Sequence, residues 1–226
     1  MRRILINSNI EAIVKEYTDK LLKKKAIKTK NLNTDNLDRI SKKLKDLSIK
    51  LVTEERSEYK KYVENIIKEL PKIIKLKPSE FDSFKDKHFN NLTSDQLCDK
   101  VPKLTEKQID EAVAKLPQGI SYKKESFNFG EKKFYELIVE AMCYNDVQKT
   151  EIRPYMKRMG LNTCVYCNAS YAVATDDRKA TFQVDHYLPK SKYPFLCISF
   201  FNLYPTCMHC NQIKSKETTY HFCLYT

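Results

Sequence analysis

An acidic residue and a histidine stand side by side in the stretch FQVDHYLPKS, residues 182–191. The carboxylate of Asp185 is a ligand that hard divalent cations prefer, and a neutral imidazole at His186 can accept a proton from water. Together they indicate hydrolytic chemistry beside a metal ion. A solvent-exposed pair or a histidine packed in the core would give the same two letters, so the surrounding motifs must decide.

Two Cys-x-x-Cys pairs flank this stretch, Cys164 with Cys167 and Cys207 with Cys210. Four thiolates in two such pairs are typical of tetrahedral zinc. We expect this zinc to be structural, because thiolates fill all four positions and leave none for water or substrate. His209 lies inside the second pair and is expected to point away. Two unrelated pairs of buried cysteines are the alternative interpretation.

The zinc would hold together the elements that position the Asp-His pair. Residues 169–175 alternate as a strand does, residues 176–179 suit a turn and residues 180–186 suit a second strand, which predicts a β-hairpin. Residues 207–216 suit a short helix. The order is therefore strand, strand, helix, and we expect the long loop between the second strand and the helix.

With the helix held beside the hairpin, Asp185 and His186 are expected to face Asn211. A carboxylate and an amide oxygen suit Mg²⁺ or a similar ion, which also takes phosphate oxygens from a substrate. An imidazole next to that ion can deprotonate an attacking water. Hydrolysis of a phosphodiester needs this combination of an activated nucleophile and positive charge on the phosphate.

This series of motifs resembles an HNH endonuclease of the four-cysteine, zinc-stapled ββα-metal (His-Me finger) type. The resemblance spans about residues 161–216 and rests on the two cysteine pairs together with Asp185-His186-x-x-Pro189-Lys190-Ser191, Asn202-Leu203 and Cys210-Asn211-x-x-Lys214. The sequence departs from the family in two respects. The last motif position is Asn instead of His, and the glycines often found after the Pro-x-Ser stretch are absent.

The resemblance implies a role for each matching residue. His186 would be the general base that deprotonates water, while Asp185 and Asn211 would hold a single catalytic divalent ion. Asn202 would brace the loop that carries the base. Two lysines would contact the substrate phosphate: Lys190 and Lys214.

The part of the chain before residue 161 reads as helical. Apolar residues recur at steps of three and four in three segments, 9–24, 37–51 and 59–70, and Pro71 is expected to end the third. Other predicted helix boundaries are starts at Ser79, Thr93 and Thr105, the last two with capping boxes, and a left-handed cap at Gly160. We therefore predict an all-α helical domain at 1–160 and a nuclease domain at 161–226, an α+β fold.

The charge of the chain favours an anionic partner. There are 41 Lys and Arg against 29 Asp and Glu, a formal net charge of +12, of which residues 1–160 carry +10 (35 minus 25). Nucleic acid is the expected partner class, and the nuclease resemblance favours DNA over RNA. The Lys-rich segments 20–30 and 41–50 would contact phosphates or would only be solvated.

Neither a membrane span nor a signal peptide is expected, since no apolar run approaches the roughly 20 residues that a span needs. We expect a cytoplasmic protein. In that compartment the four cysteines without partners at ligand spacing are expected to be buried thiols: Cys98, Cys143, Cys197 and Cys223.

The sequence YPFL at residues 193–196 and the Lys-rich helical part also resemble HNH nucleases that accompany ATPases in Septu-type anti-phage systems and retron-linked relatives. This resemblance implies an ATPase partner, docked on the helical part, and a role in antiviral defence. Two alternatives stay open. One is a non-catalytic zinc module that binds nucleic acid, and the other is a scaffold subunit whose basic helices contact an acidic partner.

Overall fold

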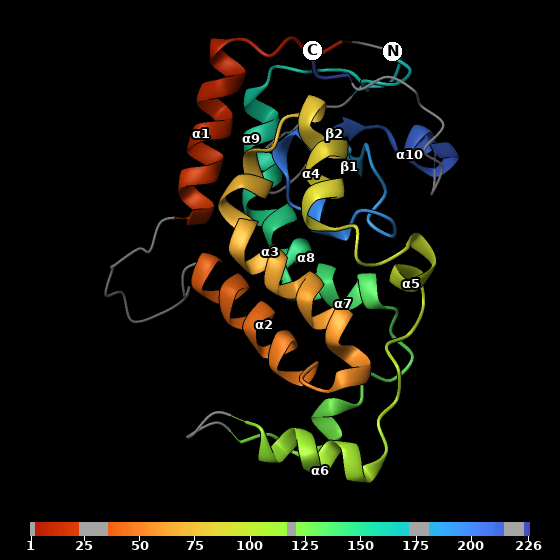
Figure 1. Cartoon of the computed structure of the whole chain (residues 1–226). Helices are drawn as coiled ribbons and strands as arrows, with labels where there is room; N and C mark the ends of the chain where they lie inside the picture. The colour runs from red at the N-terminus through yellow and green to blue at the C-terminus, as the bar shows by residue number, and fades with distance from the viewer. Residues whose placement is uncertain (1–2, 23–35, 117–120, 172–180, 215–223) are drawn as a thin grey trace, which may run out of the picture.

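The computed structural model of the chain describes residues 3–22, 36–116, 121–171, 181–214 and 224–226, and it is mostly helical with one two-stranded sheet (Figure 1). The helices are α1 (Ser8–Leu22), α2 (Asn36–Lys50), α3 (Ser57–Lys75), α4 (Phe81–His88), α5 (Ser94–Cys98), α6 (Glu106–Ala114), α7 (Phe134–Ala141), α8 (Tyr144–Val147), α9 (Arg153–Arg158) and α10 (Met208–Lys214). The strands are β1 (Gln183–His186) and β2 (Leu203–Thr206). Among the described residues, no helix combines the length and the apolar character that crossing a membrane requires.

The first three helices follow the predicted apolar stripes. In α1 the buried side chains include Ile10, Val14, Tyr17 and Leu21, which recur at steps of three and four. Figure 1 shows α2 and α3 running alongside each other, and both contribute fully buried aliphatic residues. Burial of one stripe on each helix against its neighbours is what holds these helices together.

Pro71 does not end α3, contrary to the prediction. The helix continues to Lys75, with Pro71 on its exposed side. Proline removes one hydrogen bond from the helix, but Ile73 and Ile74 beyond it are fully buried. Packing of these two residues offsets the lost hydrogen bond, so the helix runs one turn further.

The predicted helix ends at Thr93, Thr105 and Gly160 are confirmed. The hydroxyl of Thr93 accepts from the backbone N–H of Gln96, whose side chain in turn accepts from the backbone N–H of Thr93. The same capping box forms at Thr105 before α6. Gly160 follows α9 with φ of 68°, a left-handed conformation that glycine adopts without steric cost.

β1 pairs with a strand that the sequence pattern does not predict. β1 pairs antiparallel with β2, with Asp185 opposite Tyr204 and His186 opposite Leu203. The long loop therefore lies between the two strands, and only Cys207 separates β2 from α10. The sequence pattern does not identify β2, because all four of its residues are buried and the alternation of apolar and polar residues that marks a half-buried strand is absent. Most of the predicted first strand, residues 172–175, lies outside the described residues.

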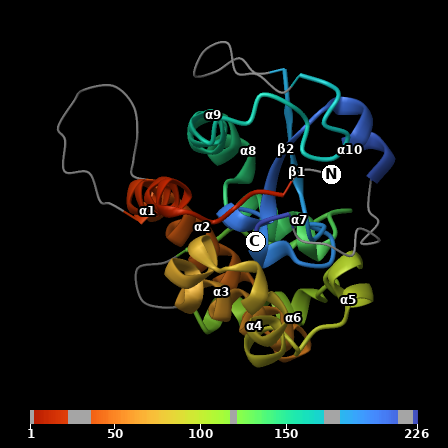
Figure 2. The same cartoon turned by 90° about the horizontal axis from the view of Figure 1, so that it is seen from above.

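One buried core connects the helices to the sheet. Phe89, which follows α4, stacks on Phe195 of the loop between the strands, with ring centroids 4.2 Å apart. The hydroxyl of Tyr17 in α1 donates to the carbonyl of Ile198 in the same loop at 2.8 Å. Figure 2 shows α8 and α9 on one side of the strands and α10 on the other. The division of the chain at residue 160 stays a prediction.

Candidate active site and metal centre

Strand β1 presents its predicted functional residues on opposite faces. Gln183 and Asp185 lie on the face that contacts α10, because successive side chains of a strand alternate. The amide of Asn211 donates to Oε1 of Gln183 at 2.6 Å, and Nζ of Lys214 lies 2.9 Å from Oδ2 of Asp185. His186 points the other way, toward α8 and the loop. The structure therefore brings Asp185 close to α10 but does not bring the imidazole there.

Asp185 is buried with two polar partners. Its Oδ2 accepts a hydrogen bond of 2.6 Å from the hydroxyl of Tyr166 and pairs with the ammonium of Lys214. The same ammonium donates to the backbone carbonyl of His186. The side chains of Asp185 and Lys214 are only 9% and 1% exposed, so Lys214 is a buried counterion here and not a solvent-facing lysine.

The imidazole of His186 is oriented by a backbone carbonyl. Nε2 lies 3.0 Å from the carbonyl oxygen of Cys197. Because a carbonyl can only accept, this contact assigns the proton to Nε2 and leaves a lone pair on Nδ1. The ring of Tyr144 in α8 lies 4.9 Å from the imidazole, centroid to centroid.

Burial keeps this imidazole neutral. The pKa of His186 is lowered to about 3, chiefly by loss of solvation and in smaller part by the nearby ammonium groups of Lys190 and Lys214, while the hydrogen bond to Cys197 acts in the opposite direction. At neutral pH the ring is therefore uncharged. It has the protonation state that a proton acceptor needs.

Asn202 holds together the loop between the strands. Its Oδ1 accepts from the backbone N–H of Leu188 at 2.8 Å. Its amide donates to the carbonyls of Leu188 and Leu196, both at 3.2 Å. The side chain is fully buried, and these bonds satisfy both ends of the amide. These hydrogen bonds hold together the two ends of the loop that follows His186.

The four predicted zinc ligands come together. The sulfur atoms of Cys164, Cys167, Cys207 and Cys210 all lie within 4.8 Å of one another. Tetrahedral zinc with Zn–S bonds of about 2.3 Å needs sulfurs about 3.8 Å apart, so this donor set fits the metal. The cluster joins the turn at residues 164–167 to the start of α10, and His209 within the second pair is exposed.

Backbone hydrogen bonds favour the thiolate form at two of the four cysteines, Cys167 and Cys207, by lowering the pKa of each, whereas burial raises the pKa of Cys210. Asn168 adopts a left-handed φ of 55° and closes the first turn by donating its N–H to the carbonyl of Cys164 at 2.8 Å. Hydrogen bonding to the backbone of Ser170 is the largest cause that lowers the pKa of the Cys167 thiol to about 6. A thiolate is the form that binds a metal.

Oxygen donors for a second ion lie on β1 and α10. The amide nitrogen of Asn211 is used by Gln183, which leaves its Oδ1 for a cation. Asp185 contributes a carboxylate whose Oδ2 already has two partners. One carboxylate and one amide oxygen on packed elements fit a hard divalent ion that completes its coordination with waters and phosphate oxygens.

Lys190 lies on the other face of β1, near His186. Its ammonium is 4.4 Å from the ring centroid of Tyr144, in cation–π contact. Burial lowers the pKa of this lysine. It also lines a cavity of about 700 Å³, so of the two lysines expected near phosphate, Lys190 is the one with an open space before it.

Three contacts of this site are not among those that the sequence predicts. Tyr166, inside the first cysteine pair, hydrogen-bonds Asp185. Tyr144 was not singled out, and Cys197 was expected only to be a buried thiol, yet its carbonyl orients His186. A backbone carbonyl leaves no mark in a sequence, so no signal could have identified this last contact.

Comparison with known proteins gives one partial similarity. The chain is 38% identical over 69 residues to the Septu protein PtuB of Bacillus thuringiensis. The match covers 29% of this chain and 25% of that protein, so the chain spans about a quarter of the length of this relative. No family model matches the chain. No solved structure matches it either.

Proposed function

We propose that this chain is a metal-dependent HNH endonuclease that hydrolyses phosphodiester bonds of DNA. One observation carries the proposal: a buried, neutral imidazole is oriented by the carbonyl of Cys197, one residue after a carboxylate that faces α10. The order of elements supports the same assignment: β1 is followed by a long loop with Asn202, then by β2 and α10, and four clustered cysteines lie next to them. The fold is then a helical part at 1–160 followed by a nuclease domain at 161–226.

His186 is the general base in this proposal. Its Nδ1 accepts the proton of the attacking water, and the bond from Nε2 to Cys197 holds the ring and stabilises the imidazolium that forms. A pKa of about 3 makes a weak base. An anionic phosphate beside the ring raises that pKa, so the base gains strength when substrate is present. General-base catalysis of this kind contributes about 10² to 10⁴ in rate.

Asp185 and Asn211 hold the divalent ion, Mg²⁺ or a similar metal, and zinc at the four cysteines is structural. The ion supplies positive charge to the phosphate and to the leaving oxygen. Asn202 fixes the loop so that the carbonyl of Cys197 stays under the imidazole. Lys190 adds positive charge near the phosphate, and Lys214, the buried counterion of Asp185, adds positive charge behind the metal site from the other face of β1.

The similarity to a Septu protein supports a role in anti-phage defence. We propose a cytoplasmic nuclease whose helical part docks on an ATPase partner, as the resemblance of the sequence implies. The excess of ten positive charges before residue 161 supports contact of this part with DNA or with an acidic surface. RNA is the less favoured substrate.

The test is cleavage of supercoiled plasmid with Mg²⁺, Mn²⁺ or EDTA. We expect wild type to cut only with the divalent ion, and His186→Ala to lose activity by at least 10² while its zinc content and DNA affinity stay unchanged. His88→Ala, a histidine replacement in α4 far along the chain, is the matched control and should cut normally. Equal cutting by wild type and His186→Ala would refute the proposed base.

A second candidate is a non-catalytic zinc module that binds nucleic acid. The pairing of Asp185 with Lys214 favours it, since a carboxylate with a buried counterion has less need of a metal. This module would bind DNA without cutting it, with affinity that falls steeply with salt as lysines displace counterions. A scaffold subunit that binds only an acidic protein would bind DNA weakly and with little dependence on salt concentration.

A further inference from the structure

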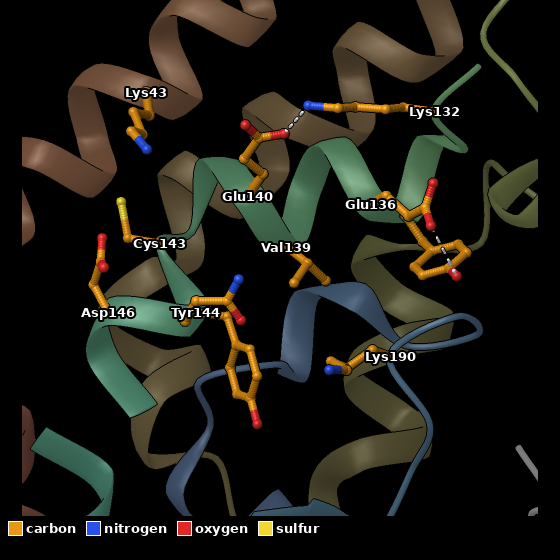
Figure 3. Close-up of a pocket in the computed structure, with 11 residues that line it drawn as sticks. Lys43, Lys132, Glu136, Val139, Glu140, Cys143, Tyr144, Asp146 and Lys190 are labelled. Atoms are coloured by element: carbon orange, nitrogen blue, oxygen red, sulfur yellow. Dashed lines mark hydrogen bonds and ion pairs between the residues drawn. The ribbon is translucent and has the colours of Figure 1, made fainter. Parts of the chain in front are cut away.

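A cavity of about 700 Å³ opens between α2, α7, α8 and the loop that carries Lys190 (Figure 3). Its wall includes Lys43 from α2, Tyr135 and Glu140 from α7, and Tyr144 from α8. The volume lies within the usual range for small-molecule sites. It suits a single nucleotide unit and is too confined for a duplex.

The carboxylates of this cavity already have cationic or hydrogen-bonding partners. Glu140 pairs with Lys132 at 2.5 Å, and Asp146 pairs with Arg39 at 2.5 Å. Glu136 accepts the backbone N–H that begins α7, at 2.9 Å. These contacts offset the negative charge of the wall, so the acids do not repel an anion as free carboxylates would.

Two ammonium groups remain for a ligand. Within the part of the chain that the structure describes, neither Lys43 nor Lys190 has a carboxylate at ion-pair distance. Figure 3 shows them on different sides of the cavity, Lys43 beside Cys143 and Lys190 beside Tyr144. Two separated cations that have no carboxylate partner among the described residues, in one concave site, match an anion that carries charge at two points.

The cavity adjoins the proposed base. Tyr144 lines the cavity, and its ring contacts both the imidazole of His186 and the ammonium of Lys190. A ligand in the cavity would therefore be one side chain away from the imidazole. The half-buried ring of Tyr135 in the wall also offers apolar surface on which a base can stack.

We propose that this cavity binds one nucleotide unit of the substrate strand next to the bond that is cut, with its flanking phosphates on Lys43 and Lys190. This inference rests on the proposed nuclease function and assigns to it a substrate subsite on the helical part of the chain. Tyr144 positions the nucleotide relative to His186, and it takes no part in proton transfer. A strand with an unpaired nucleotide is the preferred substrate, because a paired base would have to leave its duplex to enter.

The test measures binding of thymidine 3′,5′-bisphosphate, a probe with both flanking phosphates, by calorimetry in Mg²⁺-free buffer. We expect Lys43→Gln and Lys190→Gln each to weaken binding by at least tenfold, and unphosphorylated thymidine not to bind. Lys45→Gln is the matched control, since Lys45 is an exposed lysine of the same helix that does not line the cavity. Thermal unfolding of each variant checks that it is folded.

The outcomes separate this inference from the proposed function. Equal affinity of wild type and Lys43→Gln, or an equal loss in Lys45→Gln, would overturn the subsite even if His186-dependent plasmid cutting is found. Selective loss of binding without any plasmid cutting would leave the subsite standing and refute the nuclease. If both hold, Lys43→Gln should raise the KM for a single-stranded oligonucleotide about tenfold and leave kcat within twofold.

Discussion

At the scale of single residues, Lys214 and Asp185 form an ion pair that water hardly reaches. Removing one partner of a buried pair leaves the other charge uncompensated and costs about 3–5 kcal/mol. We therefore expect Lys214→Met to lower the free energy of unfolding by about this amount in Mg²⁺-free buffer. Urea unfolding measures it.

The same variant tests whether Asp185 accepts a divalent ion. If it does, Mg²⁺ should replace the missing ammonium and restore part of the lost stability of Lys214→Met. The double variant Asp185→Asn, Lys214→Met has no carboxylate left and should gain nothing from Mg²⁺. An equal gain in both variants would mean that the ion binds elsewhere.

His186 makes stability depend on pH. Its folded-state pKa of about 3 lies below the ordinary value of 6.5, so between these values the unfolded chain binds a proton that the folded chain does not. Stability is therefore unaffected by this group above pH 6.5 and falls as the pH drops below it, by up to about 1.4 kcal/mol per pH unit. Around the ring, the positive charges of Lys190 and Lys214 act in the same direction as burial, and the hydrogen bond to the carbonyl of Cys197 opposes them without cancelling the shift.

Replacement by glutamine should remove this contribution. We expect wild type to lose about 2 kcal/mol more than His186→Gln between pH 7 and pH 5, measured by urea unfolding without added divalent ion. His209→Gln, at an exposed histidine, serves as the control for the loss of a histidine. Parallel pH profiles for wild type and His186→Gln would show that the imidazole is not buried in its neutral form.

At the scale of elements, α10 depends on its attachments. It has seven residues, too few to be stable as an isolated helix. It is joined to β1 through Asn211 and Lys214, and to the turn at residues 164–167 through the cysteine cluster. We therefore expect the position of Asp185 relative to Asn211 to depend on zinc at this cluster.

Removal of zinc should free this helix while most of the protein stays folded. We expect a strong zinc chelator, or Cys207→Ser, to speed hydrogen exchange of the amides of α10 by at least tenfold and to leave α3 unchanged. Cys98→Ser is the matched control, because Cys98 lies outside the cluster. Unchanged exchange in α10 after complete loss of zinc would show that packing alone holds it.

The sequence predicts the end of a helix correctly where neighbouring residues alone determine it. The capping boxes at Thr93 and Thr105 and the cap at Gly160 need only neighbouring residues, and all three were predicted. Strand β2 was missed, because burial on both faces erased its alternation. Pro71 was misjudged, because packing beyond it outweighs one lost hydrogen bond.

The arrangement of the candidate site can be predicted from the sequence only in part. The clustering of four cysteines follows from their spacing. That Asp185 and His186 point to opposite faces follows from strand alternation and could have been predicted. The carbonyl of Cys197 under the imidazole could not, since it depends on the path of a loop that Asn202 fixes through long-range hydrogen bonds.

At the scale of the whole molecule, the loop between the strands is buried against the helices. Phe195 stacks on Phe89, and Ile198 accepts the hydroxyl of Tyr17. The loop that orients His186 thus takes its position from helices far earlier in the chain. If residues 1–160 and 161–226 separated, each part would expose to solvent its share of this common core.

This shared core predicts that helices and sheet unfold together. Phe195 is 1% exposed, and its replacement by alanine should cost about 3–5 kcal/mol. In calorimetry we expect wild type to show one transition, and Phe195→Ala to shift that whole transition to lower temperature because the loop and the helices lose the same contact. Phe129→Ala, at a half-buried phenylalanine that packs on Arg56 away from the strands, is the control for loss of a ring. Two transitions in wild type, with only one of them moved by Phe195→Ala, would instead show that residues 1–160 and 161–226 are independent folding units.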